Sequence, residues 1–165
     1  MTTISRAAAT RQVHLQDPAA PTASLVVPSV HVAVRGWGGR LLLVCRCDSG
    51  AWELPGGRVD VGETAGGSAV RQTAEDSGVR VLLTGFAGTF TDPSYVIRSP
   101  GGEVCQVFAL LFRARALGGV PRGDLHRTSE AAWVAFADLR DLVIVPPVRA
   151  WIEQALDVHA DPYLG

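Results

Sequence analysis

Hydrophobic and polar positions alternate in several short segments of the chain, a pattern typical of β-strands. Residues 30–35 alternate clearly, and the apolar segment 40–46 follows a Trp-Gly-Gly turn, so these two segments are predicted to pair as a hairpin. Residues 104–114 form the strongest strand pattern in the chain. Further short strands are predicted at 52–54, 79–83, 86–91 and 131–136. The pattern therefore predicts a sheet built from many strands.

Two segments have helical rather than strand periodicity. Over residues 64–77 the small and apolar side chains recur near helical spacing, with Thr64 as the N-cap and Gly78 as the stop. A second helix is predicted over residues 146–158, where a proline can occupy the first position. Strands mixed with one central and one terminal helix predict an α/β fold in which a sheet lies between helices.

The N-terminal residues 1–27 are rich in Ala, Thr and Pro and have no sustained periodicity, which predicts a loosely packed arm before a domain of residues 28–165. A chain of 165 residues is long enough for one domain with a core. The apolar runs are too short to cross a membrane, and no apolar signal segment follows the N-terminus. We therefore expect a cytoplasmic protein.

Composition excludes some partners. The net charge of −1 gives no general attraction to nucleic-acid polymers. All 15 cationic residues are Arg, which suits phosphate recognition, although a genome-wide codon bias is the simpler explanation. The three cysteines have no spacing that completes a metal site, so we expect reduced thiols in strands or the core.

A cluster of charged and amide side chains on the central helix carries the candidate chemistry. Arg71, Gln72, Glu75 and Asp76 lie on consecutive turns, where residues three and four apart share a face. The glycine-rich loop 55–62 precedes this helix, and glycines let main-chain groups approach a ligand closely. Two carboxylates suit Mg²⁺, which shares its other positions with water and phosphate. Taken alone, the cluster also fits a solvated helix face with one ion pair.

The spacing of the residues from Gly57 to Val79 is more specific. After five intervening residues Gly57 is followed by Glu63, and after seven more by Arg71. The series is completed by Thr73, Glu75, Asp76, Gly78 and Val79. It resembles the Nudix box, G-x5-E-x7-R-E-U-x-E-E-x-G-U, and the preceding Glu-Leu-Pro-Gly is similar to the usual approach to that box. The resemblance extends over residues 28–158 and implies a Nudix-like α/β/α sandwich with a mixed, curved sheet.

The resemblance implies a hydrolase that uses Mg²⁺ or Mn²⁺ to direct water onto one phosphorus of a nucleoside diphosphate linked to another group X. The expected partner is thus a small nucleotide or nucleotide sugar. Glu75 and Asp76 match the metal-binding acids of the family, and Arg71 matches the residue that orients them. Gly56 matches a main-chain carbonyl ligand, and Glu63 matches the early Glu, which is a weaker ligand or a loop anchor.

Two positions depart from the family pattern. Gln72 stands where the box has its first Glu, and Asp76 stands where it has its last. A Gln side chain cannot act as a general base, but its carbonyl oxygen can still bind a metal. We therefore expect weaker binding of additional metal ions and lower turnover. The alternatives are a catalytically weak or inactive nucleotide-binding sensor or interaction domain, and a scaffold that neither binds nor hydrolyses nucleotides.

Outside the box, three residues are candidates for the site. Glu130 joins Arg71 and Glu75 as a candidate catalytic residue, although a polar residue at a strand start is an equally good interpretation. Arg46 is expected at the edge of a cleft, where it could hold a phosphate. Tyr95 could contact substrate, although a solvated hairpin tip is the favoured interpretation. The base, the group X and the oligomeric state, a homodimer included, stay open.

Overall fold

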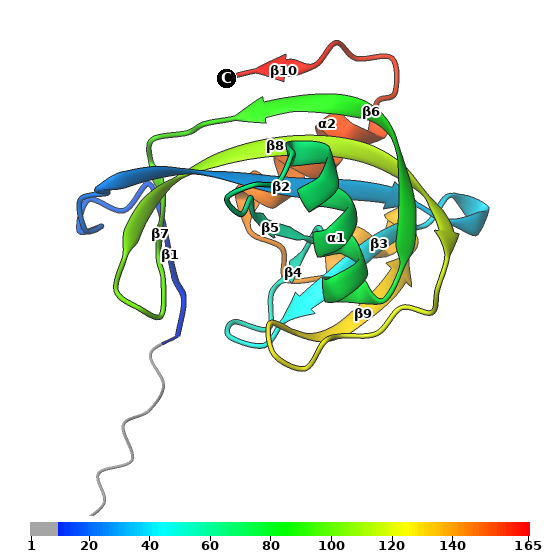
Figure 1. The fold of residues 1–165 in the computed structure, drawn as a ribbon, viewed down its shortest axis with the longest axis horizontal. Coiled ribbons are helices and arrows are strands. Elements are labelled where there is room, and N and C mark those ends of the chain that lie inside the picture. The colour runs from blue at the N-terminus through cyan, green and yellow to red at the C-terminus, as the bar shows by residue number, and fades with distance from the viewer. Residues whose placement is uncertain (1–9) are drawn as a thin grey trace, which may run out of the picture.

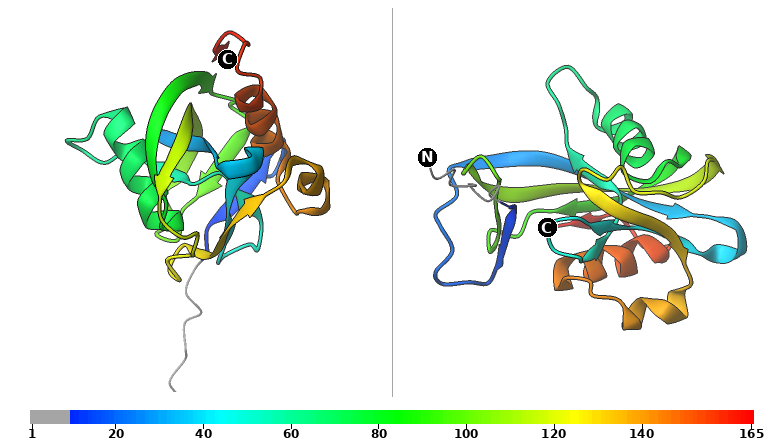
Figure 2. Two further views of the ribbon diagram at one scale, coloured as in Figure 1. Left: turned by 90° about the vertical axis from the view of Figure 1, so that its right-hand side faces the viewer. Right: turned by 90° about the horizontal axis from the view of Figure 1, so that it is seen from below.

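The computed structural model describes residues 10–165, which form a strongly curved sheet with a helix on each side (Figures 1 and 2). The strands are β1 Gln12–Leu15, β2 Leu25–Arg35, β3 Leu41–Arg46, β4 Trp52–Glu53, β5 Gly56–Arg58, β6 Arg80–Phe90, β7 Tyr95–Arg98, β8 Val104–Gly118, β9 Thr128–Val134 and β10 Tyr163–Leu164. The helices are α1 Ala65–Ser77 and α2 Pro146–Leu156, with short 3-10 turns η1 Trp37–Gly39 and η2 Phe136–Asp141. The expected α/β class with a mixed sheet between helices is confirmed.

The sheet is organised around β2 and β8, which run parallel from the pair Leu25↔Cys105 to the pair Arg35↔Arg115. Its main path has the order β1-β7-β8-β2-β3-β4, while β6 also pairs with β8, β9 with β3, and β5 with β2. Because β5 lies antiparallel against β2, the chain leaves the centre of the sheet directly into the loop before α1. The loop before α1 is therefore attached directly to a central strand of the sheet.

Alternation along the central strands supplies a core on each face of the sheet. On one face, Val30, Val32 and Val34 of β2 pack with Ala69 of α1. On the other face, Ala33 joins the cluster that includes Trp151 of α2. Burial of both faces explains why the middle parts of these strands, residues 30–34 and 107–112, are mostly apolar. No helix within residues 10–165 is both long and apolar enough to cross a membrane.

The N-terminal part of the domain differs from the sequence prediction. Residues 1–9 of the predicted arm lie outside the described residues, but Gln12–Leu15 pairs antiparallel with β7, and β2 already begins at Leu25. Part of the segment expected to be loosely packed therefore belongs to the sheet. Main-chain pairing with β7 and β8 holds it, and such pairing leaves little trace in side-chain periodicity.

Two strand predictions are also revised. The predicted hairpin of β2 and β3 exists only at its tip, through the pair Arg35↔Leu41, because β3 then diverges to pair with β9. The segments 79–83 and 86–91 form the single strand β6, which bends through register shifts around Gly85 and Gly88. These bulges let one strand follow the curved edge of β8 without a break.

Candidate active site

The loop and helix predicted to carry the chemistry lie beside the central strands. In α1 the hydroxyl of Thr64 accepts a hydrogen bond from the Gly67 amide, which confirms the predicted N-cap, and Gly78 ends the helix in the left-handed conformation. Glycine at position 56 is required by close approach, since a Cβ there would lie 2.0 Å from the Val30 carbonyl oxygen. The loop can therefore run tightly against β2 and place the helix over the sheet.

On the solvent side of α1, Arg71 holds three carboxylates. Its guanidinium donates to Glu63 Oε2 at 2.8 Å, to Glu75 Oε2 at 3.0 Å and to Asp60 Oδ2 at 3.1 Å. The hydrogen bond from Arg71 lowers the pKa of Glu63 to about 2, and the same contact raises the pKa of Arg71. Arg71 thus connects the glycine-rich loop to the helix and orients Glu63 and Glu75.

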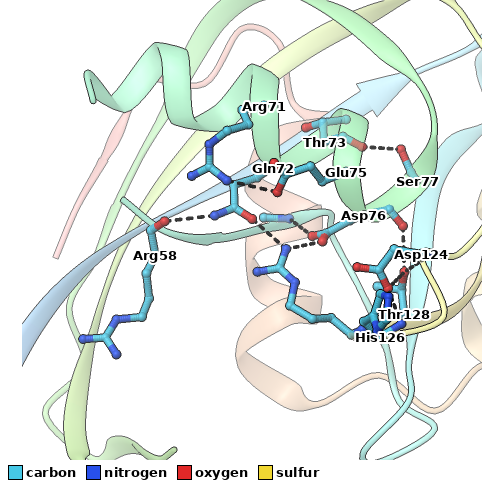
Figure 3. A network of polar contacts seen from close by, with 12 residues as sticks. Arg58, Arg71, Gln72, Thr73, Glu75, Asp76, Ser77, Asp124, His126 and Thr128 are labelled. Carbon is cyan, nitrogen blue, oxygen red and sulfur yellow. Dashed lines mark hydrogen bonds and ion pairs between the residues drawn. The ribbon is translucent and has the colours of Figure 1, made fainter. Parts of the chain in front are cut away.

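The inner side of α1 carries Gln72 and Asp76, which are only 3% and 1% exposed (Figure 3). Asp76 Oδ2 accepts from the Gly56 amide at 3.1 Å, and Asp76 Oδ1 accepts from the Arg127 guanidinium. Gln72 Oε1 accepts from the same Arg127 nitrogen at 2.6 Å, while Gln72 Nε2 donates to the Arg58 carbonyl at 2.9 Å. Burial raises the pKa of Asp76, and Arg127 opposes that rise.

The turn before β9 presents Arg127 to the helix. The Asp124 carboxylate accepts from the amides of His126 at 2.8 Å, Arg127 at 2.8 Å and Thr128 at 2.9 Å. Burial opposes ionisation of Asp124, but these amides hold its pKa below the usual range. The Thr128 hydroxyl donates to the Asp76 carbonyl oxygen at 2.8 Å, so the turn is attached directly to the end of α1 (Figure 3).

A cleft of about 610 Å³ opens beside these residues. Gly57 and Arg127 line it from the side of the box, and Arg46, His31, Tyr95 and Trp151 line it from the sheet and α2. The His31 ring lies 4.7 Å from that of Trp151, and burial lowers the His31 pKa to about 3, so the imidazole is neutral at physiological pH. The cleft therefore combines aromatic walls with charged side chains of both signs, since Asp48 and Glu53 also line it.

Of the three candidates outside the box, Arg46 and Tyr95 line the cleft and Glu130 does not. Arg46 lines the cleft and donates to Asp48 Oδ2 at 2.9 Å. Tyr95 also lines it, but as a buried residue of β7, which corrects the interpretation of a solvated hairpin tip. Burial raises the pKa of Tyr95 to about 12. Glu130 is exposed on β9 opposite Cys45 and has no side-chain hydrogen bond or ion pair within residues 10–165, so its catalytic role stays a prediction.

Sequence reasoning missed Asp124, Arg127 and Thr128, none of which it named as a candidate for the site. Arg127 is 51 positions from Asp76 along the chain, so no local spacing connects them. One signal was available: an Asp followed by polar residues favours a turn in which its carboxylate caps the next amides. That signal predicts the shape of the turn but not the helix on which it packs.

Few donor atoms on α1 are available to a divalent cation. Within residues 10–165 no group of three or more His, Cys, Asp and Glu side chains is gathered as a metal site. Asp76, Glu75 and the amide oxygen of Gln72 remain, with Gly56 beside Asp76. One or two carboxylates suffice for Mg²⁺, which takes its remaining oxygens from water and phosphate. The Arg127 guanidinium, however, already contacts the oxygens of Asp76 and Gln72.

Comparison with known proteins agrees with this geometry. Residues 26–155 match the NUDIX domain family model, and the chain belongs to that family. The putative 8-oxo-dGTP diphosphatase 2 of Mycobacterium tuberculosis (strain ATCC 25618 / H37Rv) is 34% identical over 119 residues, which cover 67% of this chain and 78% of that protein. The box resemblance is thereby confirmed, and the enzyme class is that of a Nudix-type hydrolase of phosphoanhydride bonds.

Solved structures share the fold. The MutT NUDIX hydrolase from Burkholderia pseudomallei superposes with a TM-score of 0.63 at 26% identity, covering 78% of this chain and 96% of that one. The NUDIX domain of Shewanella oneidensis NrtR, solved in complex with ADP ribose, gives a TM-score of 0.63 at 23% identity, with 84% of this chain and 90% of that one covered. Nudix hydrolases generally use divalent metals, and the fold described here is theirs.

Proposed function

We propose that this protein is a divalent-metal-dependent pyrophosphohydrolase that cleaves a nucleoside diphosphate linked to another group X, with Mg²⁺ or Mn²⁺. The observation that carries the proposal is that Asp76 and Gln72 hydrogen-bond to residues that line a cleft of about 610 Å³, a volume in the range of small-molecule sites. These lining residues are Gly56, Arg58 and Arg127. Family membership supports hydrolysis of a phosphoanhydride bond.

Each group of side chains has a proposed task. Asp76, Glu75 and the Gln72 carbonyl oxygen would hold the metal, which when bound supplies positive charge to the pyrophosphate oxygens. Arg71 keeps the Glu75 carboxylate oriented through its 3.0 Å contact. Arg46 also lines the cleft, and a phosphate there would share its guanidinium with Asp48, which accepts from Nε at 3.4 Å and from Nη2 at 2.9 Å.

The proton acceptor and the base pocket follow from the same chemistry. Gln72 cannot take a proton from the attacking water, so Glu75 is the proposed acceptor, with Glu130 as the second candidate. Tyr95 and Trp151 form an apolar wall of the cleft that would adjoin a bound base, although both residues are packed in the core and present little open ring surface. The neutral imidazole of His31 beside them can form hydrogen bonds to the base, and it carries no charge that would attract a phosphate.

A substrate panel tests the proposal. The protein is incubated with nucleoside diphosphate derivatives and with 8-oxo-dGTP, suggested by the name of the tuberculosis relative, in Mg²⁺ or Mn²⁺, and the released products are measured. Glu75→Gln is the site variant, and Glu153→Gln on the exposed face of α2 is the matched control. We expect turnover in the wild type and in the control only. Wild-type turnover no greater than that of Glu75→Gln would reject the proposal.

A second candidate is a domain that binds nucleotides with little or no cleavage. The neutral amide of Gln72 and the contact of Arg127 with Asp76 favour it, since both reduce the negative charge available to a metal. Calorimetry that detects nucleotide binding without turnover would support this candidate. If Gln72→Glu then restored turnover, the missing carboxylate would be the cause.

A further inference from the structure

The guanidinium of Arg127 lies where a cation would contact the inner face of α1. One of its nitrogens donates both to Gln72 Oε1 at 2.6 Å and to Asp76 Oδ1. The Asp76 side chain is 2% exposed, whereas that of Arg127 is 38% exposed. A buried carboxylate requires a compensating charge, and in this structure Arg127 provides it.

The contact is built into the fold and is not an accidental surface pair. The Asp124 carboxylate holds the main chain of Arg127 through its amide at 2.8 Å. Gly57 leaves the necessary room, since a Cβ there would lie 3.0 Å from Arg127 Nη1 and 2.9 Å from Gln72 Oε1. The main chain of Arg127 is thus anchored, while its partly exposed side chain can turn into the adjoining cleft.

A divalent cation and this guanidinium compete for the same oxygens. Both need the lone pairs of Asp76 and of the Gln72 amide, and two cations at contact distance repel one another. With a neutral Gln72, the single charge of Asp76 is the one that pairs with Arg127. We propose that Arg127 is the resting occupant of the cation position, and that a divalent cation binds only when Arg127 leaves Asp76. This inference rests on the proposed metal dependence.

Direct metal binding tests the proposal without any turnover assay. Mn²⁺ affinity is measured from the electron paramagnetic resonance signal of the free ion, for the wild type, Arg127→Met and Arg58→Met. Arg58 is the matched control, because it lines the same cleft but pairs with Glu103 at 2.7 Å. We expect Arg127→Met to bind Mn²⁺ about tenfold more tightly than the wild type, or about 1.4 kcal/mol. Arg58→Met should stay close to the wild type.

Two further variants identify the contact and guard against a folding defect. Adding Asp76→Asn to Arg127→Met should remove the gain in affinity, because the negative charge for which the two cations compete is lost. Arg127→Met leaves Asp76 buried without its partner, so it should melt at a lower temperature than the wild type and recover more on addition of Mn²⁺. Arg127→Lys keeps a cation and should show a smaller gain than Arg127→Met.

The outcomes separate this inference from the proposed function. Equal or weaker Mn²⁺ binding by Arg127→Met than by the wild type would overturn the displacement by Arg127 and leave metal dependence intact. An equal gain in Arg58→Met would overturn it as well, since the effect would then be general electrostatics. Absence of Mn²⁺ binding in every variant would overturn both this inference and the metal dependence on which it rests.

Discussion

Replacing Thr128 by Val tests whether the turn that carries Arg127 is truly attached to α1. The Thr128 side chain is fully buried, and its hydroxyl donates to the Asp76 carbonyl at 2.8 Å and accepts from the Asp124 amide at 3.0 Å. Asp76 is in the last turn of α1, where carbonyls have no partner within the helix. Valine has nearly the same shape but leaves both main-chain groups without this partner. We therefore expect the loss of two buried hydrogen bonds.

The expected loss follows from those two groups. A buried donor or acceptor left unpaired costs about 1–3 kcal/mol. The greater apolarity of valine offsets part of that sum, so Thr128→Val should lower the free energy of unfolding by about 2–4 kcal/mol. For a domain of this size such a change lowers the melting temperature by roughly 4–16 °C.

Thr73→Val is the matched control. Thr73 is also fully buried, and its hydroxyl donates at 2.8 Å to the Ala69 carbonyl, four residues earlier in α1. That carbonyl remains available to the helical ladder after substitution, so no group is newly orphaned. Thr and Val have similar helix propensities. We expect Thr73→Val to change the free energy of unfolding by less than about 1 kcal/mol.

Urea unfolding of both variants, with the slope of free energy against urea concentration unchanged, measures the difference. A loss in Thr128→Val that exceeds the loss in Thr73→Val by about 2 kcal/mol supports the attachment of the turn to α1. Equal losses in the two variants would refute this attachment. The loss of stability would then come from removing a buried hydroxyl, and not from leaving the Asp76 carbonyl and the Asp124 amide unpaired.

Three further predictions concern charge. Gln72→Glu should raise turnover, because it adds a carboxylate to the site. It should also lower the free energy of unfolding by about 1–3 kcal/mol, because the 2.9 Å hydrogen bond from Gln72 to the Arg58 carbonyl is lost. Steady-state kinetics and urea unfolding measure the two effects, and unchanged turnover would contradict the first. The pKa of His31 in the folded protein is about 3, below its ordinary 6.5, so between these pH values His31 gains a proton only in the unfolded chain. The free energy of unfolding therefore falls on acidification by at most about 1.4 kcal/mol per pH unit. His31→Gln should reduce this slope, and an unchanged slope would argue against the prediction. The pKa of Glu63 is about 2, against an ordinary 4.5, so its ionised form stabilises the fold fully above pH 4.5 and this stabilisation is lost as the pH falls towards 2. A carboxyl titration by NMR should show a midpoint near 2 in the wild type that rises towards 4.5 in Arg71→Met. A wild-type midpoint near 4.5 would contradict the prediction.

The sequence by itself determined the features that depend on local order along the chain. The box spacing from Gly57 to Val79 placed Gln72 and Asp76 on one helix, and the capping roles of Thr64 and Gly78 followed from residue type alone. Helical and strand periods differ, so α1 and the strand β8 were recognisable from their patterns. Local geometry is encoded within a few residues, which explains why these predictions agree with the structure.

Only the tertiary structure decided which distant residues meet at that helix. Arg127 reaches Asp76 because β9 pairs with β3 and the turn before β9 packs on the end of α1. Tyr95 lines the cleft because β7 pairs with β8, although an Asp-Pro-Ser sequence typical of an exposed turn directly precedes it. These contacts depend on strand pairing and packing between segments far apart in the chain, and no single stretch of sequence encodes them. The spacing of the box therefore identifies the polar side chains of α1, whereas the fold decides that Arg127 contacts Gln72 and Asp76 among them.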